Sequence, residues 1–441
     1  MWLISLLLFL LHFCLAITFF VSGLIINCVQ CVLYVTIQPI NPALFKWINY
    51  YLHWSICAQI VFVAEWWSSS DCRLHVSSED LPFLGREHAL LVMNHTYEID
   101  WLMGWIIAER CGVLGSAKVF LKDVLRYVPV VGWSWSFSNL VFLRRNWRDD
   151  QKHVDDQLNI LADYPYPVWM LIFCEGTRFT VDKHYVSMGV ARAKGFPELR
   201  NLLLPRPRGF THTVSRLRHK FAAIYDLTVE FDTKNYAQPT LTNMIRRRPI
   251  RGDIHVRRIP MSDLPSPPTR QPTTATTTEA ETAQLENAEE KALTNYLFEI
   301  YRYKDEKMST YRANRHSLPA TFSDDSAKEI LDNVWRANGD KSDAPTLTAD
   351  NTRAHILPRR LFTLLNTCAW LCVVFVGVWR LVLVKLAQVH GEGVGWMAIA
   401  LAAGVGGVIA LLSLFGLRKL VNLTKISRSS SYGQKQSDTN K

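Results

Sequence analysis

The chain has 441 residues, of which 49% are hydrophobic and 20% are charged, and its formal net charge is +10 at pH 7. This length suffices for one sizeable catalytic domain with accessory segments. The positive charge comes without zinc-finger spacing, a basic zipper or an aromatic RNA-binding signature, so the composition argues against nucleic acid and favours anionic lipid headgroups or a bilayer surface as the partner.

The first expected element is an N-terminal membrane region at residues 1–67. No Asp, Glu, Lys or Arg occurs in residues 1–45, and a second uncharged apolar stretch covers residues 48–64. The first run exceeds the ~20 residues that a helix needs to cross a bilayer. It also lacks the basic start and the short apolar core of a cleaved signal peptide. We therefore predict membrane-embedded helices that the mature protein keeps.

Residues 68–311 have the pattern of an α/β catalytic domain. Short apolar runs, which are typical of buried strands, alternate there with helical stretches. The expected strands are residues 89–93, 168–174, 202–204, 222–231 and 254–259. The expected helices are residues 101–107, 151–162, 188–193 and 295–311.

Three further segments contain too few large apolar residues to form a core, and we expect them to be disordered or loosely held. They are an insertion at about 265–290, a flexible tether at 312–358 and a tail at 420–441. Between the tether and the tail, residues 359–419 contain two uncharged apolar runs, 361–379 and 393–417. These runs predict a C-terminal transmembrane helical hairpin.

Basic residues flank this hairpin on both sides. Arg359 and Arg360 precede it, and Arg418 and Lys419 follow it. Because loops with basic flanks remain in the cytosol, we expect both ends of the hairpin to lie there. The catalytic domain joins the hairpin through the tether and should therefore face the cytosol too. Whether the N-terminal helices span the membrane or lie in one leaflet stays open.

A histidine and an aspartate follow the first expected strand. The segment at 94–100 reads NHTYEID, which puts His95 at the carboxyl end of a strand, where α/β sheets bind their ligands. Asp100 falls near the first turn of the next helix. An imidazole with a carboxylate behind it can take a proton from a hydroxyl, because the carboxylate fixes the tautomer and stabilises the imidazolium. His95 and Asp100 are therefore a candidate catalytic pair, although a structural histidine would give the same pattern.

A second polar block follows the strand expected at 168–174. It reads FCEGTRFT at 173–180. The glycine at position 176 lets the backbone approach a ligand closely, and Arg178 can hold a phosphate with two parallel charge-assisted hydrogen bonds. Seen alone, the block is explained equally well as a strand-end turn with a surface glutamate and arginine.

Together, and in this order, the two blocks resemble the motifs of the glycerolipid acyltransferase family, and of its lysophosphatidic acid acyltransferases in particular. The likeness extends to KVFLKDVLRYVPVVG at 118–132, VFLRRNW at 141–147 and LLLPRPRGFT at 202–211. It is strongest toward the animal gamma and delta forms of 1-acylglycerol-3-phosphate acyltransferase, with which the chain shares EWW at 65–67. The resemblance implies a glycerolipid acyltransferase-like α/β fold.

The resemblance also implies an activity and its residues. An acyl group would pass from acyl-CoA to the sn-2 hydroxyl of lysophosphatidic acid, giving phosphatidic acid at the endoplasmic reticulum membrane, with the nuclear envelope and the Golgi as alternative locations. His95 would be the general base and Asp100 its orienting partner. Beyond acyl-CoA as co-substrate, no cofactor and no metal ion is implied. Further residues implied to bind the substrates are Glu175, Gly176, Thr177, Arg178, Lys122 and Arg145.

Two other functions remain open on the sequence alone. The acceptor could be another lysophospholipid, such as a lysophosphatidylinositol, because the motifs do not separate the two. A catalytically silent lipid-binding scaffold is the second alternative, against which the intact His95 and Asp100 argue. A hydrolase is disfavoured, since Ser136 replaces the closing glycine of the elbow-like GWSWS at 132–136. An acyl-enzyme on Cys174 is unnecessary, because a hydroxyl can attack a thioester directly.

Overall fold

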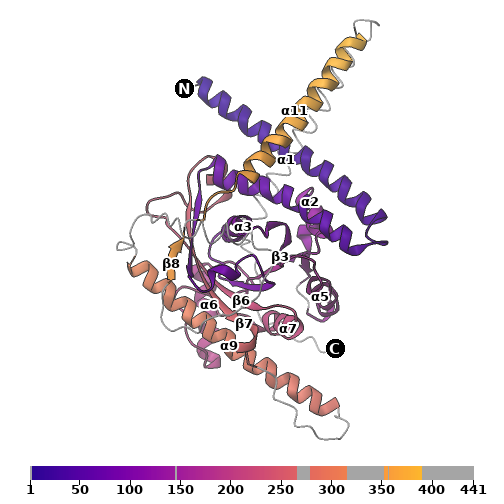
Figure 1. The fold of residues 1–441 in the computed structure, drawn as a ribbon. Coiled ribbons are helices and arrows are strands. Elements are labelled where there is room, and N and C mark those ends of the chain that lie inside the picture. The colour runs from indigo at the N-terminus through magenta and orange to yellow at the C-terminus, as the bar shows by residue number, and fades with distance from the viewer. Residues whose placement is uncertain (1, 145–146, 266–278, 315–351, 356, 390–441) are drawn as a thin grey trace, which may run out of the picture.

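The computed structural model describes residues 2–144, 147–265, 279–314, 352–355 and 357–389. Within them, a mixed sheet of eight strands forms the centre of the molecule, and apolar helices lie at one end of it (Figure 1). The α/β class expected from the alternating sequence pattern is confirmed.

The sheet has the strand order β4-β3-β5-β2-β6-β7-β1-β8. Strands β4, β3, β5, β2 and β6 run parallel, so their carboxyl ends meet at one edge. Strand β7 is antiparallel to β6, and β1 pairs parallel with β7 and antiparallel with β8. The strands are β1 (Asp71–Ser77), β2 (Ala89–Met93), β3 (Ala117–Lys122), β4 (Val141–Leu143), β5 (Trp169–Ile172), β6 (Ala223–Phe231), β7 (Arg251–Pro260) and β8 (Thr352–His355).

Helices cover both faces of the sheet. Successive side chains of a strand point to opposite faces, and β2 shows the result: Leu91 joins the core beneath α3, whereas Leu90 joins the core beneath α5, α7 and α9. Figure 1 shows these helices around the sheet. The helices of the α/β domain are α3 (Asp100–Arg110), α4 (Val131–Phe137), α5 (Trp147–Ala162), α6 (Val181–Lys194), α7 (Pro207–Leu217), α8 (Leu241–Ile245) and α9 (Glu279–Asn314).

Two apolar helices, α1 (Trp2–Thr36) and α2 (Pro42–Phe62), precede the sheet. Among the described residues, the segment Leu8–Thr36 of α1 is the one helix long and apolar enough to cross a membrane. Buried polar side chains join the two helices, as where Gln30 Nε2 donates to Asn49 Oδ1 at 2.7 Å. The outward side of α1 is apolar, and its exposed side chains include Phe9, Leu10, Val32 and Val35.

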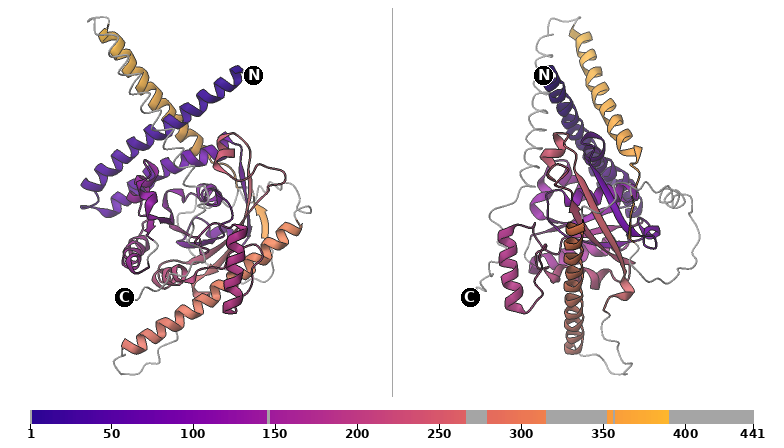
Figure 2. Two further views of the ribbon diagram at one scale, coloured as in Figure 1. Left: turned by 180° about the vertical axis from the view of Figure 1, so that it is seen from behind. Right: turned by 90° about the vertical axis from the view of Figure 1, so that its left-hand side faces the viewer.

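The first half of the expected C-terminal hairpin is one helix, α11 (Leu361–Val389). It continues beyond residue 379, where we expected it to end, because Arg380 and Lys385 are good helix formers. The apolar stretch Leu361–Gly377 forms its first part. Helices α1 and α11 cross and project from one end of the molecule (Figure 2). The second apolar run, 393–417, and the tail, 420–441, lie outside the described residues.

The described ends of the expected insertion and tether contain regular structure. Helix α9 begins at Glu279, inside the expected insertion, because the Ala, Glu and Gln residues there favour a helix. Near the end of the tether, β8 pairs with β1, and Leu357 is only 1% exposed. The chain is thus fixed to the sheet before it enters α11. Residues 266–278 and 315–351 lie outside the described part.

One expected strand is wrong. Residues 202–204 are buried, but their backbone donates to side chains instead of a neighbouring strand: the N–H of Leu203 reaches the Glu175 carboxylate, and that of Leu204 reaches Ser187 Oγ. Strands β1, β3, β4 and β8 were not expected, since short or partly polar runs give weak alternation.

Candidate active site

The turn between β2 and α3 brings His95 and Asp100 together. His95 Nδ1 lies 3.1 Å from Asp100 Oδ2. The same carboxylate oxygen accepts hydrogen bonds from the backbone N–H groups of Thr96 (2.7 Å) and Tyr97 (2.9 Å). Asp100 is the first residue of α3, where a negative charge is favoured by the helix dipole. The carboxylate therefore fixes both the turn and the orientation of the imidazole.

The environments of the two side chains differ. Asp100 is fully buried, and burial raises the pKa of its carboxyl, whereas the contact with His95 opposes that rise. The His95 side chain is 23% exposed and stacks on the Phe173 ring, with centroids 4.3 Å apart. Because Asp100 occupies Nδ1, Nε2 is the nitrogen that can exchange a proton with a substrate.

Asn94 ties this turn to the neighbouring strand. Its side-chain amide donates to the carbonyl of Val229 at 3.0 Å and accepts from the N–H of the same residue at 2.7 Å. The residue is fully buried. A glycan on the Asn-His-Thr sequence at 94–96 would require this turn to open.

Glu175 joins the two sequence blocks through the interior. It follows β5, which is the direct neighbour of β2. Its Oε1 accepts from the N–H of His95 at 2.8 Å, and its Oε2 accepts from the N–H of Leu203 at 3.2 Å. The side chain is fully buried, and burial raises its pKa to about 8. Glu175 therefore holds the backbone beneath the imidazole and lies behind the exposed surface of the site.

The next residues of the block form a tight turn. Gly176 has φ +69°, a left-handed conformation that favours glycine, and a Cβ there would lie 3.2 Å from the Arg206 side chain. Thr177 Oγ1 accepts from Lys183 Nζ at 2.9 Å. The turn is bound to the first block, because the N–H of Phe179 donates to the carbonyl of His95 at 2.8 Å.

Arg178 lies in this turn, half-buried near Asp100. Burial lowers the pKa of its guanidinium, and the negative charges of Glu98 and Asp100 oppose this. Its Nε is buried and has no hydrogen-bond partner among the described residues. A buried donor of this kind is costly to leave unpaired, and a ligand oxygen would satisfy it.

The remaining candidates lie toward β3 and β4. Lys122 is the last residue of β3, two strands from β2, and it is exposed at the same carboxyl edge as His95. Arg145 lies just beyond Arg144 and outside the described residues. The structure thus brings His95, Asp100 and the 175–178 block together and places Lys122 along their edge.

Sequence reasoning missed the support that α9 gives to this site. Lys304 Nζ is buried, pairs with Asp226, and donates to the carbonyls of Leu227 (2.6 Å) and Val92 (3.3 Å), near the end of β2. Asp305 accepts from the N–H groups of residues 200 (2.9 Å) and 201 (2.6 Å), at the start of the loop that leads to Arg206. The pattern at 295–311 predicted a helix but carried no signal of these contacts.

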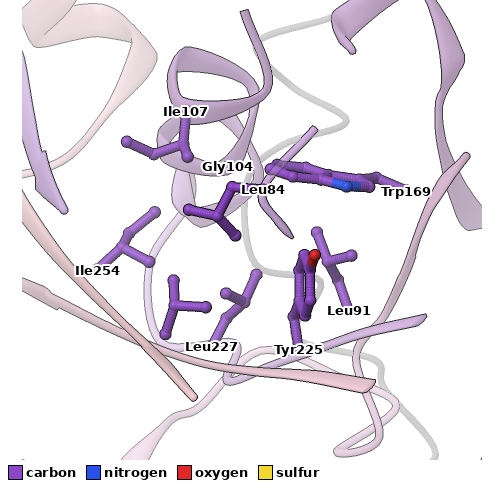
Figure 3. Close-up of a pocket in the computed structure, with 9 residues that line it drawn as sticks. Leu84, Leu91, Gly104, Ile107, Trp169, Tyr225, Leu227 and Ile254 are labelled. Carbon is purple, nitrogen blue, oxygen red and sulfur yellow. The ribbon is translucent and has the colours of Figure 1, made fainter. Parts of the chain in front are cut away.

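A small apolar cavity lies between α3 and the sheet, away from these polar groups. Figure 3 shows Leu91, Trp169, Tyr225 and Leu227 around it. Its apolar lining suits a packing void, and we assign it no part in the chemistry.

Comparison with known proteins identifies the family of this chain. The model of the acyltransferase family matches residues 73–229, from β1 to β6. The chain is 35% identical over 436 residues to the 1-acyl-sn-glycerol-3-phosphate acyltransferase delta of Bos taurus, covering 98% of this chain and 97% of the relative. It is 34% identical over 429 residues to the gamma form of Homo sapiens, covering 97% of this chain and 96% of the relative.

The chain belongs to the 1-acyl-sn-glycerol-3-phosphate acyltransferase family. It is therefore an acyltransferase enzyme, as the resemblance implied. The chain is 45% identical to the delta acyltransferase of Macaca fascicularis over 257 residues. This aligned region covers 58% of this chain and 67% of the relative. The family match contains His95 and Glu175, whereas α9 lies beyond it.

Proposed function

We propose that this acyltransferase transfers the acyl group of acyl-CoA to the sn-2 hydroxyl of lysophosphatidic acid, giving phosphatidic acid and CoA. The observation that carries the proposal is the pairing of His95 Nδ1 with the buried Asp100 carboxylate at 3.1 Å, at the carboxyl ends of the parallel strands of the sheet. A base that is oriented in this way and partly exposed suits proton removal from a hydroxyl.

The reaction is a direct transfer. His95 Nε2 takes the proton as the hydroxyl oxygen attacks the thioester carbonyl, and a tetrahedral intermediate forms. The carbon–sulfur bond then breaks, and the imidazolium returns the proton to the CoA sulfur. General-base assistance contributes ~10² to 10⁴ in rate, and positioning of the two substrates adds to it. Cys174 takes no part, because it is buried and burial raises the pKa of its thiol.

Basic groups supply the phosphate contacts. Arg178, whose buried Nε has no protein partner among the described residues, would bind the phosphate of lysophosphatidic acid. Lys122, exposed on the same edge, and Arg145, beyond β4, would meet the anionic groups of either substrate. Gly176 and Thr177 would shape the turn around the acceptor, and Glu175 would hold that turn against His95.

The membrane supplies the acceptor. The outward apolar side of α1 suits a bilayer, where a lysolipid can keep its chain while its headgroup reaches His95. The basic residues Arg359 and Arg360 at the start of α11 favour the cytosolic side, where acyl-CoA is available. We therefore propose that the enzyme is attached to a membrane with its catalytic domain in the cytosol. The endoplasmic reticulum, which the resemblance implied, is the membrane that we propose.

A panel of lysolipids tests the acceptor. The purified full-length protein would receive one acyl-CoA and, in turn, lysophosphatidic acid, lysophosphatidylinositol and lysophosphatidylcholine, with His95→Ala as the control. We expect the highest kcat/KM with lysophosphatidic acid and no transfer by His95→Ala. A higher kcat/KM with lysophosphatidylinositol would show that this lipid is the acceptor. Equal product from a folded His95→Ala protein would show that His95 is not the general base.

A further inference from the structure

A turn of three consecutive arginines follows α8. Arg246, Arg247 and Arg248 are all exposed. The turn is ordered by its own backbone, since the N–H of Arg247 donates to the carbonyl of Met244 and that of Arg248 to the carbonyl of Asn243, both at 2.9 Å. We call residues 246–248 the arginine turn.

The middle residue has an unfavourable backbone conformation. Arg247 has φ +57°, in the left-handed region that glycine or asparagine adopts more readily. The backbone at this helix end would accept a glycine, so the arginine is kept for its side chain, whose Nε donates to the carbonyl of Trp67 at 3.4 Å. A strained residue of this kind points to a use for its side chain.

The arginine turn is fixed to the apolar helix α1. The carbonyl of Ile245 accepts from His12 Nε2 at 2.7 Å and from Trp67 Nε1 at 2.9 Å. The Arg247 guanidinium lies 5.2 Å from the centre of the Trp67 ring. His12 belongs to the segment Leu8–Thr36, which is long and apolar enough to cross a membrane. Three positive charges are therefore held beside the helix that would enter the bilayer.

We propose that the arginine turn binds the phosphate groups of anionic phospholipids at the membrane surface. The exposed apolar side chains of α1, such as Phe9 and Leu10, would enter the hydrocarbon, which leaves the neighbouring arginines at headgroup level. Guanidinium groups bind phosphates in two-pronged fashion, and a tryptophan such as Trp67 suits the interface. The inference rests on the membrane attachment in the proposed function, but not on the acceptor or the catalytic base.

The position of α8 gives this contact a consequence for catalysis. The first residue of α8, Leu241, donates its N–H to Glu98 Oε1 at 3.3 Å, and Glu98 lies between His95 and Asp100 in the sequence. One end of a five-residue helix thus contacts the catalytic turn, and the other carries the arginine turn. Lipid bound at the arginines would set the height of the active site above the bilayer.

Lipid binding by the full-length protein tests the proposal. The protein, purified in a neutral detergent, would be titrated with phosphatidylglycerol or phosphatidylcholine, and bound lipid would be counted by native mass spectrometry. We expect wild type to prefer phosphatidylglycerol. The combined substitution Arg246→Gln, Arg247→Gln and Arg248→Gln should weaken phosphatidylglycerol binding roughly a hundredfold, since each basic residue contributes about fivefold at an anionic surface. Phosphatidylcholine binding should not change.

Two further variants separate binding from folding. Arg247→Gly relieves the left-handed strain, so it should fold at least as well as wild type and still bind phosphatidylglycerol about fivefold less tightly. The matched control removes three exposed charges elsewhere, with Arg192→Gln, Lys194→Gln and Arg302→Gln, and should bind like wild type.

Three outcomes would overturn the proposal. The first is unchanged phosphatidylglycerol binding in the triple arginine variant, and the second is an equal loss of binding in the matched control. The third is displacement of the lipid by inorganic phosphate or CoA at equal concentration, because that result would show a site for a soluble phosphate. Because the assay involves no turnover, its result is independent of the acyl-transfer assay that tests the proposed function.

Discussion

The Asp100 carboxylate contacts the His95 ring and the backbone N–H groups of two residues of the same turn. Asp100→Asn keeps an oxygen for these N–H groups but can present an amide N–H to the imidazole, which favours the wrong tautomer. We expect kcat to fall by ~10³ to 10⁴. Initial rates with both substrates saturating would measure kcat for the variant and for wild type.

The matched control is Asp156→Asn, at an exposed position on α5, which should leave kcat unchanged. A correctly folded Asp100→Asn protein with wild-type turnover would show that the imidazole needs no anionic partner.

Arg178 should act on the acceptor and not on proton transfer, because its guanidinium cannot serve as a base at neutral pH. Arg178→Ala removes charge-assisted hydrogen bonds of ~1.5 to 3 kcal/mol, so the KM for lysophosphatidic acid should rise roughly ten- to hundred-fold. Arg178→Lys should recover part of the loss. Titrating each substrate with the other saturating would check this. A rise confined to the acyl-CoA KM would assign Arg178 to the CoA site.

Glu175 should make stability depend on pH. Its pKa is raised to about 8 in the folded protein, against about 4.3 in an unfolded chain, so between these values only the folded state keeps the proton. The contribution of this group to stability therefore falls as the pH rises from about 4.5 to 8. The unfolding temperature of wild type should fall more over that range than that of Glu175→Gln, with the exposed Glu299→Gln as control. If the unfolding temperatures of wild type and Glu175→Gln changed with pH in parallel, Glu175 would not be the source of the pH dependence.

Single residues were predictable from the sequence where the chemistry is local. His95 and Asp100 lie within one turn, so their spacing was enough to pair them. The contacts of Glu175 were not predictable, because its partners, His95 and Leu203, are 80 and 28 residues away in the sequence. The approach of Arg206 to Gly176 also depends on how two loops fold against each other.

At the scale of elements, α9 extends the catalytic unit beyond the family match. Its residue Asp305 accepts two backbone N–H groups from the loop that leads to Arg206. Asp305→Ala leaves both N–H donors without this acceptor, which should lower the free energy of unfolding by ~1 to 3 kcal/mol. Leu203 of this loop donates to Glu175 and Arg206 lies beside Gly176, so we expect the loosened loop to lower kcat/KM about tenfold, which is ~1.4 kcal/mol.

The control for this prediction is the next residue. Glu306→Ala, on the exposed side of the same helix, should change neither stability nor kcat/KM. If Asp305→Ala lowered the unfolding temperature and left both KM values and kcat intact, α9 would support the fold alone.

Elements with regular apolar periodicity were predicted well, and the central strands β2, β5, β6 and β7 are the clearest cases. The sequence could not distinguish a buried strand from the buried loop at 202–204, because burial gives both the same apolar composition. It also could not reveal β8, whose four residues form a strand only because the edge of β1 is available to pair with them.

For the whole molecule, the arrangement of α1, α11 and the catalytic domain predicts one orientation in the membrane. An epitope inserted at position 275 should be digested by protease added to sealed microsomes, because the proposed cytosolic side faces the protease. An epitope tag fused at the C-terminus should behave in the same way, since both flanks of the hairpin are basic. Protection of the first epitope until detergent is added would place the catalytic domain in the lumen.

The position of β1 in the sheet has a consequence for synthesis. This strand pairs only with β7 and β8 among the described residues, and its ion pair between Arg73 and Asp253 joins residues 180 positions apart. At about 5 to 20 residues per second, β1 leaves the ribosome roughly 10 to 40 s before its first partner exists. The apolar helices α1 and α2 emerge earlier still. The nascent chain therefore waits at the membrane with an unpaired strand, and a chaperone that covers residues 71–77 during that interval would raise the yield of folded enzyme.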